Sequence, residues 1–126
     1  MNRLCLKGVA LAVVLGLTFG VGCNRPSPPP TPLSVEELPA ALEKAFGKAK
    51  PEIKDLANQV VASVQARDYS KAFLTIQNLA SRPGLTKDQV NVTSRATLTV
   101  NSLLQAAQAK GDPQAAQTLK SYRLDK

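Results

Sequence analysis

The sequence predicts an all-α fold for residues 33–126, a small bundle of four to five helices arranged as antiparallel helical hairpins. Apolar side chains in this region recur at intervals of three and four residues, the spacing that places them on one face of a helix. Residues that start, cap or stop helices stand between these runs. Aromatic residues are few, so the core must consist mainly of Leu, Val, Ile and Ala, which suits closely packed helices. The aromatic residues of this region are Phe46, Tyr69, Phe73 and Tyr122.

Two prolines locate the first two helices. Ser34 can cap a helix and Glu37 can reach back to the backbone, but Pro39 lacks the N–H that a helix needs at that depth. We therefore expect the first helix to begin at Pro39 and to run to about Ala49, and a separate first turn is the alternative. Pro51 is expected to start the second helix, because proline is favoured at the first helical position. The apolar face of the second helix is Ile53, Leu56, Ala57, Val60, Val61 and Val64.

An aspartate marks the start of the third helix. The preceding pattern ends at Arg67, and Asp68 is a good N-cap for the helix that follows. Because the connection is so short, the second and third helices must be antiparallel neighbours. The apolar positions of the third helix are Tyr69, Ala72, Phe73, Ile76, Leu79 and Ala80.

The fourth helix has a strong start signal and an ambiguous interior. Thr86 and Gln89 can form a capping box, in which each side chain bonds to the other residue's backbone. The helix could run to Lys110, with one side formed by Val90, Thr93, Thr97, Val100, Leu104 and Ala107. The segment from Ala96 to Asn101 is rich in β-branched residues, so a strand there is the alternative. The helix signals on both sides favour a helix.

The last helix follows a glycine. Gly111 can end the fourth helix, Asp112 can cap the fifth and Pro113 can start it. The apolar positions of this helix are Ala116, Leu119 and Tyr122.

Two segments of the helical region look alike. QARDYSKA at 65–72 and QAKGDPQAA at 108–116 each place a tight turn and a capping aspartate between two helices. This pattern resembles the hairpin turn of tetratricopeptide-type repeats. The 44-residue offset between the segments exceeds the usual repeat length of about 34 in that family. Two ordinary helical hairpins are the alternative to true repeats.

The N-terminal segment has the pattern of a signal peptide. Arg3 and Lys7 form a basic start, and the fifteen residues from Gly8 to Gly22 carry no charge. A membrane-spanning helix needs roughly 20 residues, so a permanent transmembrane anchor is not expected. Small residues then precede Cys23, as a signal peptidase requires. We expect residues 1–22 to be removed.

The stretch GLTFGVGC, which ends at Cys23, resembles the bacterial lipobox. In lipoproteins of that type the cysteine receives a thioether-linked diacylglycerol and becomes the mature N-terminus, so the resemblance implies lipidation of Cys23. Val21 and Gly22 match the pattern, whereas Gly20 stands where leucine is commonest. Asn24 is not the aspartate that resembles an inner-membrane retention signal. The implied location is the bacterial cell envelope, on the outer membrane facing the periplasm, with a plain secreted protein as the alternative.

Residues 23–32 form a proline-rich linker between the lipidation site and the helical domain. Asn24 to Pro32 contains five prolines and no other apolar side chain. Such segments favour the extended polyproline II form at about 3.1 Å per residue, so the linker could hold the domain up to about 28 Å from the lipid headgroups. SPPPTP also has a PxxP pattern, but the domains that read such motifs are chiefly intracellular. We therefore favour a spacer.

The residue types of the chain limit its chemistry. It contains no histidine, which excludes a Ser, His and Asp triad and any imidazole metal site. A lipidated Cys23 cannot be a nucleophile, and Ser70 and Lys71 are a poor pair because adjacent helical residues do not face each other. The acidic residues near predicted helix starts suit capping, namely Glu36, Glu37, Asp68, Asp88 and Asp112. We expect no enzyme, no cofactor and no metal site, and we name no catalytic residue.

The chain is moderately basic. It has 16 basic and 9 acidic residues, and removal of Arg3 and Lys7 leaves a side-chain balance of +5. Export and the lack of interleaved aromatic residues argue against a nucleic-acid partner, and no small-molecule substrate is indicated. We expect an envelope lipoprotein whose helical domain is a non-catalytic interaction or structural module for an envelope protein partner. The alternative is a basic surface module that binds anionic membrane or cell-wall polymers.

Overall fold

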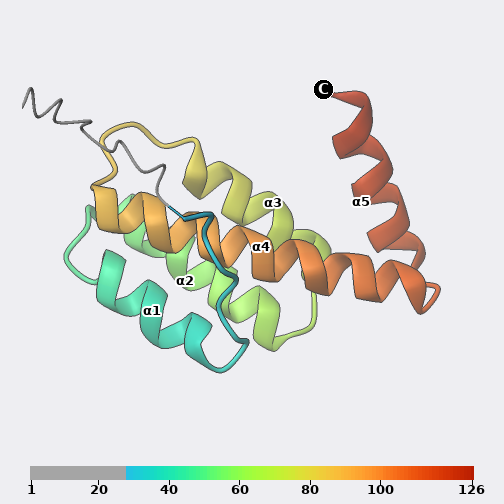
Figure 1. The fold of residues 1–126 in the computed structure, drawn as a ribbon, viewed down its shortest axis with the longest axis horizontal. Helices are drawn as coiled ribbons and strands as arrows, with labels where there is room; N and C mark the ends of the chain where they lie inside the picture. The colour runs from blue at the N-terminus through green and yellow to red at the C-terminus, as the bar shows by residue number, and fades with distance from the viewer. Residues whose placement is uncertain (1–27) are drawn as a thin grey trace, which may run out of the picture.

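The computed structural model describes residues 28–126, and all regular structure in this range is helical (Figure 1). The predicted all-α fold is confirmed, because this range contains five helices and no strand. The signal peptide predicted for residues 1–22 and the lipidation site predicted at Cys23 lie outside the described residues. The helices are α1 (Glu37–Phe46), α2 (Pro51–Gln65), α3 (Tyr69–Ala80), α4 (Lys87–Ala109) and α5 (Pro113–Leu124).

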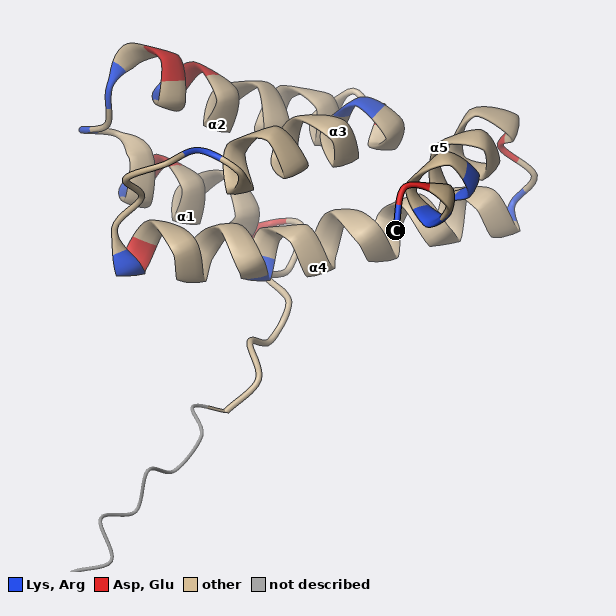
Figure 2. Ribbon diagram, turned by 90° about the horizontal axis from the view of Figure 1, so that it is seen from above, with Lys and Arg blue, Asp and Glu red and all other residues tan. Residues whose placement is uncertain are grey.

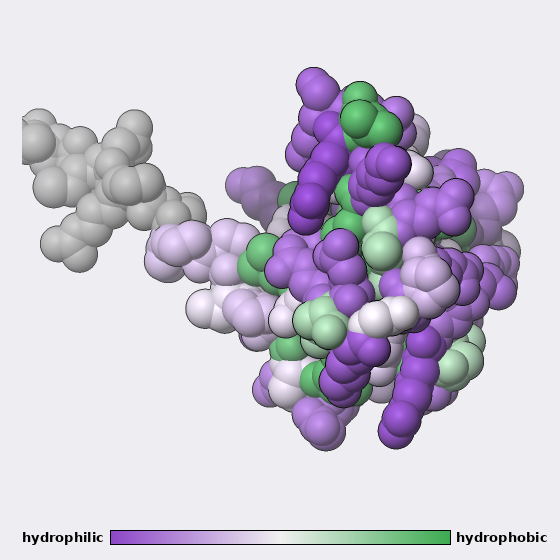
Figure 3. Space-filling model, turned by 90° about the vertical axis from the view of Figure 1, so that its right-hand side faces the viewer, coloured by the Kyte–Doolittle hydropathy of each residue, from purple (hydrophilic) through white to green (hydrophobic). Residues whose placement is uncertain are grey.

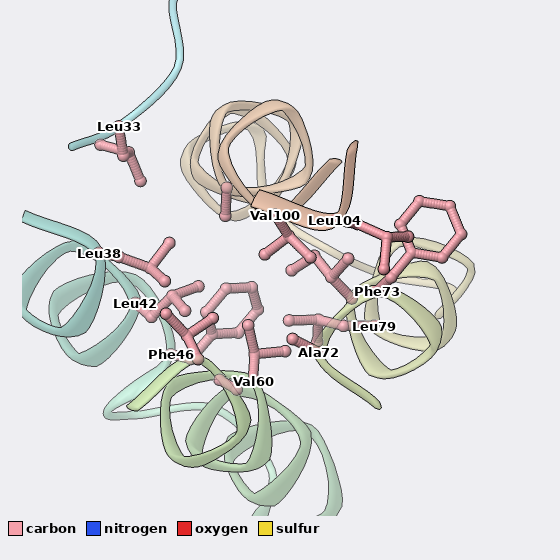
Figure 4. Close-up of a cluster of buried hydrophobic side chains, with 14 of the residues drawn as sticks. Leu33, Leu38, Leu42, Phe46, Val60, Ala72, Phe73, Leu79, Val100 and Leu104 are labelled. Atoms are coloured by element: carbon pink, nitrogen blue, oxygen red, sulfur yellow. The ribbon is translucent and has the colours of Figure 1, made fainter. Parts of the chain in front are cut away.

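Helices α1 to α4 surround one hydrophobic core. Each packs against the next along the chain, and α1 also packs against α4, which closes a ring. Figure 4 shows side chains from all four helices pointing into the space between them. Short connections make successive helices of this ring antiparallel, as predicted (Figure 1). The buried apolar residues are Leu33, Leu38, Leu42, Phe46, Ala57, Val60, Val64, Ala72, Phe73, Ile76, Leu79, Ala96, Val100, Leu104, Ala115 and Leu119.

Helix α5 lies outside this ring. It packs against α4 and, to a lesser extent, against α3. Figure 1 shows it at the far end of α4, directed away from the other helices. Ala115 and Leu119 are its buried residues, so Ala115 takes the place predicted for Ala116, which is only half-buried. The contacts of α5 therefore come from one side only.

The first helix begins earlier than predicted. The N–H of Glu37 donates to Ser34 Oγ and the N–H of Ser34 donates to Glu37 Oε2, both at 3.1 Å. This capping box makes the chain helical before Pro39, so the predicted start at Pro39 is wrong. Pro39 has no N–H to donate to the carbonyl of Val35, which is an exposed residue at this end of the helix. The helix ends at Phe46, not at about Ala49.

The fourth helix is continuous, so the strand alternative at 96–101 is wrong. Thr86 and Gln89 form the predicted capping box, with N–H to side-chain oxygen distances of 3.0 and 3.2 Å. The hydroxyl of Thr97 donates to the carbonyl of Thr93 at 2.8 Å, so this β-branched residue is satisfied inside a helix. Val90 was expected on the buried side but is half exposed. It lies about 80° around the helix from Val100, because successive residues turn by about 100°.

The two similar segments have the same turn geometry. The N–H groups of Asp68 and Asp112 donate to carbonyl oxygens five residues earlier, at 2.9 and 3.1 Å. The preceding residues both have positive φ angles, 57° at Arg67 and 91° at Gly111. Each aspartate then caps the next helix by accepting backbone N–H bonds. The 44-residue correspondence therefore extends to backbone conformation, whereas homology to tetratricopeptide repeats stays a prediction.

This correspondence yields a stability prediction. Arg67 occupies a left-handed conformation that glycine adopts without steric cost, as Gly111 does in the second turn. We expect Arg67→Gly to raise the free energy of unfolding by about 0.5–1 kcal/mol. Gly111→Ala is the reciprocal control and should lower it by about 1 kcal/mol. Urea unfolding midpoints measure both changes, and an Arg67→Gly variant no more stable than the parent would contradict the strain argument.

Candidate functional site

Residues 31–33, called the strap below, lie across α4 before the chain enters α1. Arg95 Nε donates to the carbonyl oxygen of Thr31 at 2.9 Å. Thr99 Oγ1 donates to the carbonyl oxygen of Leu33 at 2.6 Å, in a buried bond. The Leu33 side chain is 5% exposed and lies near the gap between α1 and α4 in Figure 4. The contacts of the bundle thus begin two residues before the predicted domain boundary at Leu33.

No pattern in the sequence predicted a role for Arg95 or Thr99. Their strap partners lie 64 and 66 residues away along the chain. Neither residue belongs to a cap, a turn or an apolar run, so no local pattern could have identified it. In Figure 2, α4 lies between the departing chain and helices α2 and α3. The strap therefore fixes the side of the bundle from which the chain leaves.

The strap can be tested by removing one hydroxyl. Thr99→Val deletes the donor and leaves the buried carbonyl of Leu33 unpaired, which should lower the free energy of unfolding by about 1–3 kcal/mol. Thr97→Val on the same helix is the matched control, because that hydroxyl bonds only within α4, and we expect a change within about 0.5 kcal/mol. Denaturant unfolding measures stability, and limited proteolysis measures release of residues 28–33. Equal behaviour of the two variants would exclude a structural role for the strap.

Glu37, at the start of α1 next to the strap, has a lowered pKa in the folded protein. The backbone N–H of Ser34 donates to the Glu37 carboxylate, and this bond is the main reason that the pKa of Glu37 is lowered. The Ser34 hydroxyl and the charge of Arg95 lower the pKa further, against a small opposing effect of burial. The capping carboxylate is therefore favoured in its charged form.

A lowered pKa in the folded protein predicts the direction of pH dependence. The stabilisation by Glu37 is present above the pKa of an unfolded glutamate and is lost as the pH falls through the lower folded value. We expect Glu37→Gln to be less stable than the parent near neutral pH and to show a weaker loss of stability on acidification. Thermal unfolding of both proteins across the acid range measures this. A parallel pH dependence in the two proteins would contradict it.

An apolar groove lies between α3 and α4 next to the strap. Its volume is about 340 Å³, and none of its lining residues is charged. Val90 and Leu98 at this groove are 50% and 39% exposed. Thr93 is 2% exposed, and its hydroxyl has no hydrogen-bond partner within residues 28–126. The lining residues are Pro30, Gln77, Ala80, Leu85, Val90, Thr93, Ser94, Thr97 and Leu98.

A second hollow, of about 440 Å³, lies between α3 and α5. Its floor includes Phe73 and Tyr122, whose rings meet edge to face with centroids 5.0 Å apart. Three glutamine side chains, Gln77, Gln114 and Gln117, also line it. Figure 3 looks at this end of the molecule, where hydrophilic side chains separate small hydrophobic areas. The hollow is thus more polar at its rim than the groove beside α4.

The acidic side chains and the Ser70 and Lys71 pair noted in the sequence are placed by the structure as follows. Asp68 and Asp112 cap α3 and α5, and Asp88 lies in the first turn of α4. Ser70 is buried and its Oγ lies 3.1 Å from Thr118 Oγ1, whereas Lys71 is exposed. The structure therefore does not bring Ser70 and Lys71 together. Within residues 28–126, no group of three Cys, His, Asp or Glu side chains is arranged to hold a metal ion.

None of the helices α1 to α5 combines the length and the apolar content needed to cross a membrane. Comparison with protein-family models, curated proteins and solved structures gives no match for this chain. The site is therefore defined by its own geometry: a fixed strap and the uncharged groove beside it.

Proposed function

We propose that this protein is a lipoprotein of the bacterial cell envelope, held on a membrane by lipid attached to Cys23. The observation that carries the proposal is the stretch GLTFGVGC, in which small residues precede a cysteine after a short apolar run with a basic start. Asn24 follows the cysteine, so we place the protein on the outer membrane, facing the periplasm.

We propose further that the helical bundle is a non-catalytic interaction or structural module. Acidic side chains serve as helix caps, as Asp68 does for α3 and Asp112 for α5. The groove beside α4 presents exposed Val90 and Leu98 and no charged lining residue. Contact with another surface suits these features better than general acid or base chemistry does, because such chemistry needs a placed ionisable group.

Mass spectrometry of the mature protein tests the anchor. We expect the N-terminal peptide to begin at Cys23 and to carry the mass of a diacylglycerol with or without a third acyl chain. A mature chain that begins near residue 23 without lipid would contradict the proposal and would favour a secreted protein.

Crosslinking in intact cells tests the interaction module. A photoreactive residue is placed in turn at Leu98, beside the groove, and at Asn58, on the exposed side of α2. At native expression one of the two positions should capture a specific envelope protein, because a partner contacts one side of the bundle. Failure to capture any protein selectively from either position would count against a protein partner.

A further inference from the structure

Pro30 and Thr31, which precede the entry of the chain into the bundle, lie at the edge of the groove. Pro30 lines the groove, and Thr31 is held on α4 by Arg95. Seven residues, 24–30, called the tether below, separate Cys23 from the strap. Fully extended, seven residues span at most about 25 Å. If Cys23 is lipidated, the edge of the groove stays within that distance of the attachment point.

This reach limits where the lipid attachment point can lie relative to the bundle. Helix α2 lies across the core from α4 (Figure 4). A ring of four helices with axes 8–10 Å apart is about 20 Å across, so a chain must travel about 30 Å around it to pass from α4 to the far side of α2. The tether is shorter than this path. The tether therefore cannot carry the lipid attachment point to the far side of α2, and the α4 side of the bundle is the side nearest to that point.

The surface beside the strap has the composition of a membrane-contact surface. The α4 face, defined as Val90, Asn91, Ser94 and Leu98, carries two exposed aliphatic side chains and no charge. Arg82 and Lys87 are exposed at the end of the groove where α3 connects to α4, with Asp88 as the acidic residue of that turn. Aliphatic side chains next to cations suit the boundary between acyl chains and anionic headgroups.

We propose that the α4 face and the groove rest on the lipid surface to which Cys23 is attached. This inference rests on the proposed lipid anchor and adds the side of the domain that touches the membrane. The aliphatic side chains of Val90 and Leu98 enter the headgroup region, and Arg82 and Lys87 lie against lipid phosphates. Helix α2 faces the periplasm and is left free for a protein partner.

Site-directed labelling of the lipidated protein tests the orientation. Cys23 is blocked by lipid and Cys5 is removed with the signal peptide, so an introduced cysteine is the only free thiol. Asn91→Cys on the α4 face and Asn58→Cys on α2 form a matched pair, since both replace an exposed helical asparagine. Each variant is labelled with bimane and reconstituted in vesicles of phosphatidylethanolamine and phosphatidylglycerol that carry a headgroup nitroxide.

We expect nitroxide quenching to be severalfold stronger at residue 91 than at residue 58. Equal quenching at the two positions, or stronger quenching at residue 58, would overturn the inference. Mass spectrometry of the same samples separates the two levels of the proposal. Lipid on Cys23 with equal quenching removes only the orientation, whereas absence of lipid removes the anchor and the orientation together.

A charge placed on the face supplies a second measurement. Leu98→Asp in the Asn91→Cys background should weaken the quenching at residue 91 severalfold, because a carboxylate is repelled by anionic headgroups. Leu98 is partly exposed, so the fold should tolerate the change, and circular dichroism checks this. Ala62→Asp on the exposed surface of α2 is the control and should leave quenching at residue 91 unchanged. Equal effects of the two aspartates would overturn contact through the α4 face.

Discussion

Replacing Cys23 by serine is expected to abolish incorporation of fatty acid into the protein. A serine hydroxyl cannot form the thioether to diacylglycerol, so the first step of lipid attachment fails. Burial of each methylene of an acyl chain contributes about 0.8 kcal/mol, and two chains hold a protein stably where one does so only marginally. The variant therefore loses its entire lipid anchor, and no acyl chain holds it on the membrane. Metabolic labelling with an alkyne fatty acid and cell fractionation measure the change.

Cys5→Ser is the matched control for this experiment. Cys5 lies in the segment that we expect to be removed, so its substitution should leave both lipid labelling and membrane association unchanged. Retention of fatty acid by the Cys23→Ser variant would show that the lipid is attached elsewhere. Loss of labelling in both variants would point to a general failure of export and not to the chemistry of Cys23.

The helix starts could be predicted because their signals are local. Thr86 and Gln89 are three residues apart, and their reciprocal bonds form wherever the backbone turns into a helix. Asp68 and Asp112 cap their helices for the same reason. The start of α1 was misjudged because two local signals conflict there. The capping box at Ser34 prevails, and Pro39 is accommodated in a turn that faces solvent.

The candidate site could not be predicted because its contacts are not local. The strap depends on two side chains of α4 that meet backbone more than 60 residues away. The exposure of Val90 depends on where α3 ends and how the chain returns to α4. Helical spacing gives a face for each helix, but the neighbours that cover this face follow from the order of the helices in the ring.

The position of α5 was the other feature that periodicity left open. Its apolar positions predict one buried side, but not which helices receive it. Phe73 of α3 supplies part of the answer, since its ring packs edge to face against Tyr122 at an interplanar angle of 88°. Phe73 thus belongs both to the core of the ring and to the contact that holds α5 against it.

We expect Phe73→Ala to destabilise the fold more than Thr99→Val or Gly111→Ala does. Phe73 is 2% exposed, and deletion of a buried phenylalanine ring typically costs about 3–5 kcal/mol. The edge-to-face contact with Tyr122 adds about 0.5–1.5 kcal/mol to what burial alone contributes. Domains of this size have a total stability of about 5–15 kcal/mol, so a substantial fraction of it is lost. Urea unfolding measures the change.

Leu74→Ala, at the next position of α3, is the matched control for Phe73→Ala. Leu74 is 61% exposed, so its loss should change the free energy of unfolding by no more than about 0.5 kcal/mol. Amide hydrogen exchange then locates the damage in the Phe73 variant. Because α5 is held from one side only, its amides should lose protection before those of α2. Uniform loss of protection would mean that α5 and the ring unfold as one unit, and that Phe73 supports the core without specifically holding α5.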